Sequence, residues 1–512
     1  MSSVLIALVL AASEPRDEAP RLPTAPVSVL AQGAEPGAHA ELAFDGPAGW
    51  MFAPDRPAQS PQPVDEARAA FERAEELART GRYADARLAY QRVTERFPDS
   101  VVAKEAKERS KPSAFLGWAD VVRNGPSKNR VDVVLLGDGY ELEHLKAFDK
   151  LAGDIPPLFE RQETFREYYA YFNFLRGACL SADSGVDGFG REYDTALNGH
   201  TTGTFAGHVA VDGEVVRRVL GKIPDTDGLA IVFVKTGVLG TGGGGIATIG
   251  GREVRTVIHE FGHAFGGLGD EYQTAQSHAQ GSGPVHGAPN VSGTEDPKAV
   301  PWAHWLAAKH PGVGLYEGAS GRPKGAWRPT STGCVMDSAE AFCVVCREQL
   351  VRSIYAIVDP IDACTPEPMK RGSAASLALG EAGLEFKVEV LRPSTHAIEV
   401  RWWVLPEGAL PKSGEGASRT DDEGVASGGE RARRGPLTPI AERPAQEVLA
   451  NTAGKHAFRL QRSDLKPGRY RVICRAKDAT KLRGERFPWV LSDPEGLLES
   501  ERAWWVEVRE SR

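Results

Sequence analysis

The chain has 512 residues, of which 41% are hydrophobic and 25% are charged, and its formal net charge is −8 at pH 7. This length is sufficient for about three domains of ordinary size. The acidic balance argues against a nucleic-acid-binding protein. Beyond the first residues, no apolar run approaches the ~18–20 residues that would span a membrane. We therefore expect a globular protein with no nucleic-acid partner and no membrane span.

The first residues, MSSVLIALVLAAS (1–13), have an apolar core followed by small residues. This pattern is typical of a short signal peptide and predicts a secreted or periplasmic protein, although no Lys or Arg precedes the core. The alternative is an apolar terminus of a cytoplasmic protein. Residues 14–63 are rich in Pro and Ala and lack apolar periodicity, which predicts a disordered linker.

Residues 64–112 carry apolar side chains at three- and four-residue steps, interrupted near Gly81 and stopped at Pro98. This spacing predicts a helical hairpin, and GRYADARLAYQRVTERFPDS resembles a single tetratricopeptide-like repeat. One repeat cannot bury its own apolar face. The preferred interpretation is that it packs on the neighbouring domain, and the alternative is a groove for a protein partner.

Residues 118–362 combine predicted strands and helices. The apolar runs Val131–Leu136 and Leu229–Thr236 predict two buried strands of a mixed α/β domain. The glycine tract Gly240–Gly245 lacks the Gly-Lys-Ser/Thr ending of a phosphate loop and is followed by the β-prone IATIG. It predicts an edge strand that lines a cleft where an extended substrate could pair.

His259, Glu260 and His263 form an HExxH motif within VIHEFGHAFGGLGDEY (257–272). Residues four apart share one helix face, so both histidines can bind one Zn²⁺ at about 2.0–2.1 Å. Glu260 then faces the water that the metal acidifies and can act as general base. The preceding run Glu253–Ile258 is compatible with a helix buried on one side, and the glycines at 266, 267 and 269 are predicted to end that helix. Chance occurrence in a surface helix is the alternative.

Asp270 is the preferred third ligand because it follows the glycine-rich break at a tight turn. The metzincin pattern HExxHxxGxxH would place that ligand one position earlier, at Gly269. Glu271 and Tyr272 are the alternatives. Tyr272 is also a candidate to stabilise the oxyanion that forms on a scissile carbonyl.

The segment HEFGHAFGGLGDEY resembles the signature of the IgA peptidase family, which consists of secreted bacterial zinc metallopeptidases. Six further segments agree with that family in the same order: VVLLGDGY (133–140), FREYYAYFNFLR with SADSGVD (165–187), TGGGGIATIGG (241–251), PWAHW (301–305), GLYEGA (314–319) and GCVMDSAEAFCVVCRE (333–348). The resemblance implies a zinc-dependent endopeptidase with His259, His263 and Asp270 as ligands and Glu260 as base. It does not imply that immunoglobulin A is the substrate.

Met336 lies in GCVMD, where metzincin-like enzymes place a methionine turn beneath the metal, but a methionine can equally fill a core. Four cysteines crowd the same region: Cys334, Cys343, Cys346 and Cys364. They could form two disulfides, a Cys₄ zinc site or reduced core thiols. Disulfides are favoured in an exported protein.

Residues 370–512 change to a period of two, as in LEFKVEV (384–390) and IEVRWWV (398–404). This alternation predicts an all-β domain, and LKPGRYRV (465–472) resembles a strand entry of immunoglobulin-like sandwiches. Residues 411–454, rich in Gly, Ser, Glu and Arg, predict a disordered insertion.

Together these parts predict a multidomain protein in which a metzincin-like α/β zinc peptidase domain lies between a helical hairpin and an immunoglobulin-like β-sandwich. The predicted function is that of a secreted metallopeptidase that hydrolyses peptide bonds of extracellular proteins. The alternative is a non-catalytic zinc-containing protein that binds a partner through the hairpin and the β-domain. The presence of Glu260 beside both histidines favours the enzyme. A zinc amidase acting on cell-wall peptides would share the chemistry.

Overall fold

The computed structural model describes residues 63–510 except 189, 203–206, 238, 251–255, 274–284, 332, 369–374, 410–435, 438, 441–443 and 450–453. The predicted signal peptide, nearly all of the predicted linker and most of the predicted insertion lie outside these residues. Within the described ranges, no helix is both long enough and apolar enough to cross a membrane.

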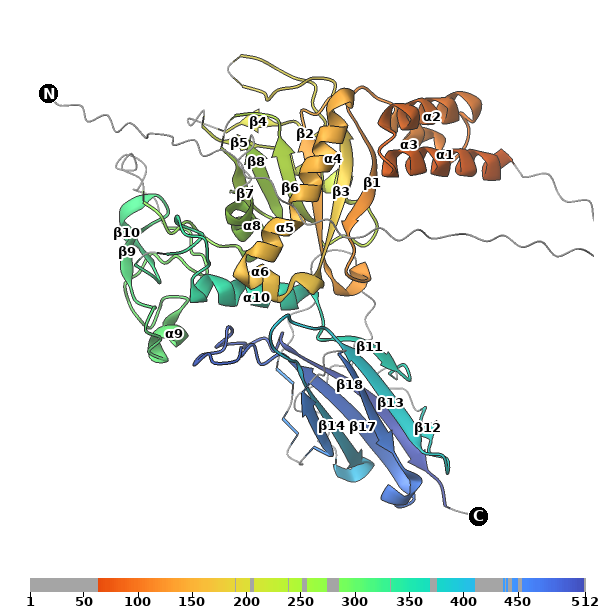
Figure 1. The fold of residues 1–512 in the computed structure, drawn as a ribbon, viewed down its shortest axis with the longest axis vertical. Coiled ribbons are helices and arrows are strands. Elements are labelled where there is room, and N and C mark those ends of the chain that lie inside the picture. The colour runs from red at the N-terminus through yellow and green to blue at the C-terminus, as the bar shows by residue number, and fades with distance from the viewer. Residues whose placement is uncertain are drawn as a thin grey trace, which may run out of the picture. The chain divides into compact units, whose positions relative to one another are not determined.

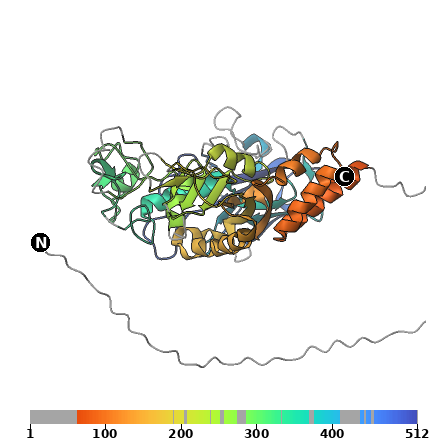
Figure 2. The same ribbon diagram turned by 90° about the horizontal axis from the view of Figure 1, so that it is seen from above.

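Three helices precede the first strand: α1 (Pro63–Arg79), α2 (Tyr83–Arg96) and α3 (Ala103–Arg109). They lie side by side in both views (Figures 1 and 2). The turn between α1 and α2 uses Gly81 at a φ of 75°, which favours glycine. The buried Tyr90 hydroxyl donates to the Leu116 carbonyl at 2.7 Å. The apolar side of these helices is thus covered by β1 of the same chain.

The central sheet has six strands in the order β1-β3-β2-β6-β8-β7 (Figure 1). Four of them, β3, β2, β6 and β8, are parallel, and the two edge strands are antiparallel to their neighbours. Both predicted buried strands are confirmed as β2 and β6, whose nearly continuous apolar runs suit strands covered on both faces. The bounds are β1 Ala114–Val122, β2 Val131–Asp138, β3 Phe172–Leu180, β6 Leu229–Val234, β7 Thr241–Gly243 and β8 Ile246–Gly250.

Helices cover both faces of this sheet. Alternate side chains of β2 enter different clusters, Val133 and Leu135 on one face and Val134 and Leu136 on the other. Residues of α7 (Gly213–Leu220) pack on the second face. Residues of the other helices join the first: α4 (Leu145–Asp154), α5 (Pro156–Arg161), α6 (Glu163–Glu167), α8 (Val257–Gly266) and α10 (Val344–Ile357).

Helix α8 carries the HExxH motif and ends at Gly266, as the glycines predicted. Gly267 follows in the left-handed conformation, with a φ of 61°, and donates its N–H to the His263 carbonyl at 3.1 Å. The run Glu253–Ile258 falls partly on residues 251–255, which lie outside the described ranges. After α8 the chain forms three further elements, α9 (Ala303–Ala307), β9 (Tyr316–Ala319) and β10 (Arg322–Arg328).

The carboxyl-terminal part consists of a three-stranded sheet, β11-β13-β16, and a five-stranded sheet, β12-β18-β17-β14-β15. Phe386 and Trp402, one from each sheet, pack with Trp504 in a common apolar cluster. The likeness to an immunoglobulin sandwich stays a prediction. The bounds are β11 Ile361–Thr365, β12 Leu377–Ala378, β13 Leu384–Val390, β14 Glu399–Pro406, β15 Gln446–Leu449, β16 Lys455–Leu460, β17 Gly468–Lys477 and β18 Glu499–Val508.

A buried ionic group joins these β-sheets to the central α/β part. His396 Nδ1 lies 2.8 Å from Glu167 Oε1, at the end of α6, and its Nε2 lies 2.6 Å from Asp478 Oδ1, just after β17. Burial alone would lower the pKa of His396, but the hydrogen bonds to Asp478 and Glu167 outweigh it and raise the pKa to about 9. His396 is therefore a charged bridge between the two parts near neutral pH.

Candidate active site

Three predicted metal-binding side chains converge at the end of α8. The Nε2 atoms of His259 and His263 lie 3.1 Å from each other. Each lies 3.1 Å from Asp270 Oδ1. A tetrahedral ion with bonds of about 2.0–2.1 Å holds its ligand atoms about 3.3–3.4 Å apart. The separations in this triad are close to that spacing.

Two backbone carbonyls fix the orientation of the imidazoles. His259 Nδ1 donates to the Val335 carbonyl at 3.0 Å, and His263 Nδ1 donates to the Leu268 carbonyl at 2.6 Å. Because the Nδ1 atoms carry the protons, both Nε2 atoms present lone pairs to the centre of the triad. This outer hydrogen bonding is the usual arrangement around metal-binding histidines.

The triad fits a cation. Asp270 Oδ1 is buried, and the two Nε2 atoms that lie 3.1 Å from it are acceptors when Nδ1 is protonated. Three acceptors in contact repel one another unless a metal ion or additional protons lie between them. In the absence of a metal, burial opposes charge on all three groups. Their mutual hydrogen bonds nevertheless raise the pKa of His263 and lower that of Asp270.

Glu260 lies on α8 between the two histidines in sequence and is only 9% exposed. Burial raises the pKa of its carboxyl, and the neighbouring histidines partly oppose this shift. A Cβ atom added to Gly242 would lie 3.0 Å from Glu260 Oε2 and only 2.5 Å from the Glu260 carbonyl oxygen. Gly242 therefore permits a close approach of β7 to α8 that no other residue allows.

The strand β7 is the edge of the central sheet, as the glycine tract predicted. It pairs with β8 antiparallel and passes directly over Glu260 and His263. The sequence does not distinguish Gly242 from the neighbouring glycines. The requirement for glycine at this position arises only in the folded protein, where β7 packs against α8.

Tyr272 stacks on His259, with ring centroids 6.2 Å apart and planes inclined by 29°. Burial raises the pKa of Tyr272 above its ordinary value, and the charge of Asp270 adds to that effect. The phenol therefore stays protonated near neutral pH and is able to donate a hydrogen bond beside the triad.

Met336 is fully buried beneath α8, and a Cβ added to Gly262 would lie 2.8 Å from its Sδ atom. The segment around Met336 also supports the triad directly. Its own carbonyl accepts from the Glu271 N–H at 2.7 Å, and the preceding carbonyl of Val335 orients His259. Met336 is thus both a core residue and part of the platform under the HExxH helix.

Asn290 was not singled out by any sequence pattern, yet it holds the turn that carries Asp270. Its Oδ1 accepts from the Gly269 N–H at 2.7 Å, and its Nδ2 donates to the Gly269 carbonyl at 2.8 Å and to Glu271 Oε1 at 2.9 Å. The residue is completely buried. A lone asparagine in a loop has no spacing signal, so only the folded structure identifies it.

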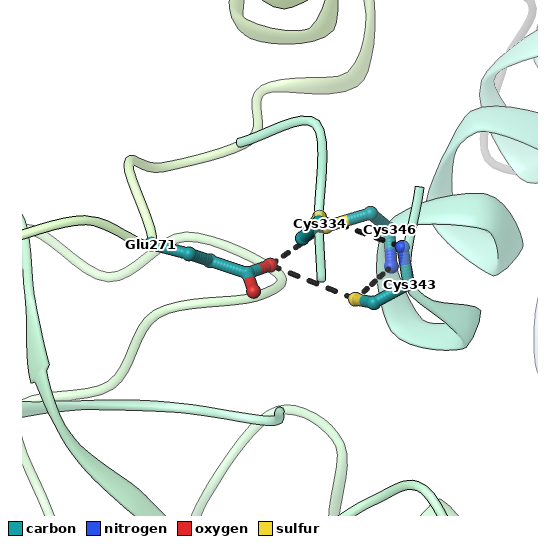
Figure 3. A group of neighbouring side chains, drawn as sticks. All are labelled: Glu271, Cys334, Cys343 and Cys346. Atoms are coloured by element: carbon teal, nitrogen blue, oxygen red, sulfur yellow. Dashed lines mark hydrogen bonds between the residues drawn. The ribbon is translucent and has the colours of Figure 1, made fainter. Parts of the chain in front are cut away.

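The carboxylate of Glu271, an alternative third ligand, lies instead among Cys334, Cys343 and Cys346 (Figure 3). All six cysteines of the chain are free thiols, so the expectation of disulfides is wrong for this structure. The Sγ atoms of Cys334 and Cys346 lie 3.7 Å apart, whereas a disulfide requires about 2.05 Å. The fourth cysteine of the predicted cluster, Cys364, lies in β11 and is not part of this group.

Comparison with the curated proteins finds no match to this chain. The model of the IgA Peptidase M64 family, in contrast, matches residues 119–312, which include the HExxH helix, Asp270 and Tyr272. This match confirms the resemblance to the IgA peptidase family over residues 119–312.

Proposed function

We propose that this protein is a secreted zinc-dependent endopeptidase that cleaves extended segments of extracellular proteins. The observation that carries the proposal is the convergence of His259, His263 and Asp270 on one point, with Glu260 beside them and an edge strand above them. The signal-like residues 1–13 support export.

His259, His263 and Asp270 would hold the zinc ion through two imidazole nitrogens and one carboxylate oxygen. Zinc in such a site supplies Lewis acidity, which polarises a peptide carbonyl and makes a water molecule more acidic. The carbonyls of Val335 and Leu268 keep both rings in the tautomer that this binding requires.

Glu260 is the proposed general base. Its side chain accepts a proton from the attacking water and transfers it to the nitrogen of the leaving amine. Glu260 is placed for this exchange because it is buried on α8 beside the two histidines. Tyr272 is proposed to donate a hydrogen bond to the carbonyl oxygen as negative charge develops on it.

The edge of β7 is the proposed binding surface for the substrate backbone. An extended peptide that adds to this edge gains main-chain hydrogen bonds and passes over Glu260 and His263. Gly242 places no side chain between the peptide and the reacting groups. Main-chain pairing with β7 requires only an extended segment of the substrate and no free chain end. We therefore propose endopeptidase rather than exopeptidase action.

The proposal is tested by incubating the zinc-loaded protein with a mixture of extracellular proteins and random peptides and identifying new amino termini by mass spectrometry. A chelator should abolish the cleavages, and added zinc should restore them. If protein shown to contain zinc at this triad produces no internal cleavage in either mixture, the proposed function is wrong.

A further inference from the structure

The chain contains a second convergence of metal-binding atoms, close to the first but separate from it. Three thiols and one carboxylate lie with one ligand atom each within 4.8 Å of all the others: Glu271, Cys334, Cys343 and Cys346 (Figure 3). All four residues are buried, and the three cysteines belong to the main apolar core. The four ligand atoms thus face a common centre that is shielded from solvent.

Two of the three separations are close to those of a tetrahedral zinc site, and the third is shorter. With Zn–S bonds of about 2.3 Å and a Zn–O bond of about 2.0 Å, tetrahedral geometry places sulfur atoms about 3.8 Å apart and sulfur and oxygen about 3.5 Å apart. Cys334 Sγ and Cys346 Sγ are 3.7 Å apart. Glu271 Oε1 lies 3.6 Å from Cys343 Sγ and 3.0 Å from Cys346 Sγ.

Backbone N–H groups donate to two of the three sulfur atoms. Cys343 is the N-cap of α10, a helix of 14 residues, and its Sγ accepts from the Cys346 N–H at 3.5 Å. The Cys343 N–H in turn donates to Cys334 Sγ at 3.4 Å. Backbone donors at a helix N-terminus favour thiolates over thiols, and thiolate is the form that binds metal.

Glu271 adds a buried carboxylate, whose negative charge a bound cation would stabilise. Its side chain is 1% exposed and accepts hydrogen bonds from Asn290 Nδ2 and Thr330 Oγ1. Both donors are neutral, and the ion pairs found in the described ranges do not include this carboxylate; the Arg328 guanidinium donates to the backbone carbonyl of Glu271 and pairs with the side chain of Asp337. A buried charge without an opposite charge is costly, and a divalent metal ion at the centre of the cluster removes that cost.

We propose that Cys334, Cys343, Cys346 and Glu271 form a structural metal site that takes one zinc ion, distinct from the HExxH triad. Four protein ligands close the tetrahedron and leave no position for substrate, which is the property of a structural rather than a catalytic site. Soft thiolates select zinc over the hard cations Mg²⁺ and Ca²⁺. The site does not depend on the proposed peptidase function.

This ion would join two segments that build the first site. Glu271 follows Asp270 directly, and its N–H donates to the Met336 carbonyl at 2.7 Å. Cys334 precedes Val335, whose carbonyl orients His259. The second ion therefore positions both a ligand of the HExxH triad and the support of another ligand.

The test uses the full chain, purified with reductant and reconstituted with zinc, together with the double variant His259→Ala/His263→Ala. This variant removes the first site and leaves the cysteines intact. Elemental analysis should find about two zinc ions in the wild type and about one in the double variant. X-ray absorption at the zinc edge of the variant should show sulfur neighbours at about 2.3 Å.

Matched cysteine variants identify the ligands. Cys346→Ser should reduce the zinc content of the wild type from two ions to one, whereas Cys364→Ser, outside the cluster, should leave it unchanged. If Cys346→Ser does not fold, the absorption spectrum of the histidine variant decides alone. A folded histidine variant that binds no zinc, or zinc with only nitrogen and oxygen neighbours, would overturn the proposal. So would a Cys334–Cys346 disulfide in the folded wild type, detected by alkylation and peptide mapping.

Discussion

Asp270 and Glu271 are consecutive in the chain, but their carboxylates face two different clusters of metal-binding atoms. Asp270 Oδ1 lies 3.1 Å from both histidine Nε2 atoms, whereas Glu271 Oε1 lies 3.0 Å from Cys346 Sγ. Asn290 holds the preceding turn through Gly269 and also contacts Glu271. The position of Asp270 in the proposed catalytic site therefore depends on the neighbouring cluster of Glu271 and three cysteines, which takes no part in the proposed chemistry.

Asp270→Asn tests the third ligand. The amide keeps the size of the side chain but removes the negative charge, so zinc affinity should fall at least about tenfold. Competition with a chelator of known affinity measures the change. Asp225→Asn is a suitable control because Asp225 has a φ of 58°, which asparagine tolerates well. Unchanged affinity in Asp270→Asn would exclude Asp270 as a ligand.

Tyr272→Phe removes the hydroxyl and keeps the ring that stacks on His259. If the hydroxyl stabilises the developing oxyanion, kcat should fall about 10²-fold while KM and zinc content change little. Steady-state kinetics on a cleaved peptide separate these quantities. Tyr316→Phe, at a tyrosine that is 38% exposed, serves as control. A change confined to KM would show instead that Tyr272 only binds substrate.

Gly242→Ala places a methyl group 2.5 Å from the Glu260 carbonyl oxygen, so β7 must move away from α8. We expect kcat/KM to fall by about tenfold or more, because misplacement of reacting groups by an ångström has effects of that size. Gly237→Ala is the matched control, since its added Cβ meets nothing within 4 Å. Equal activities of Gly242→Ala and Gly237→Ala would show that the position of β7 relative to Glu260 does not affect catalysis.

The raised pKa of His396 leads us to predict that the folded protein loses stability at alkaline pH. Its pKa is about 9 in the folded protein, above the ordinary 6.5, because Asp478 and Glu167 bind its charged form. A raised folded-state pKa contributes stability that is complete below pH 6.5 and is lost as pH rises through about 9. The contribution is at most about 3–4 kcal/mol.

Urea unfolding between pH 6 and 10 measures this contribution. The wild type should become less stable across that range, and His396→Gln should be less stable at pH 6 and show a smaller decline. His310→Gln, at a histidine whose pKa is lowered by partial burial and by Arg347 and Arg486, is the comparison. A wild-type stability that does not change between pH 7 and 10 would contradict the assignment of a charged His396.

Much of the site could be predicted because it depends on local spacing. The HExxH helix requires only that residues four apart share a face, and the glycines after it fix where the helix ends. The buried strands β2 and β6 are recognisable from continuous apolar runs. Asp270 could be ranked above its neighbours only by its place in a tight turn, and the structure brings it to both imidazoles.

Other features could not be predicted because they arise from contacts between segments far apart in sequence. The direction in which Glu271 points depends on the position of Cys343 and Cys346, more than 70 residues later. Export favours disulfides, but no spacing rule in the sequence distinguishes a disulfide-bonded group from a thiol cluster that includes a carboxylate. The roles of Gly242 and Asn290 likewise follow from tertiary contacts alone.

The most direct test of the account compares the zinc content and peptide cleavage of the wild type with those of Glu260→Gln, with the exposed Glu340→Gln as control. The account predicts equal zinc in all three proteins, full activity in Glu340→Gln and a loss of kcat of several orders of magnitude in Glu260→Gln. Substantial cleavage by zinc-loaded Glu260→Gln would contradict the assignment of Glu260 as the base and, with it, the proposed mechanism.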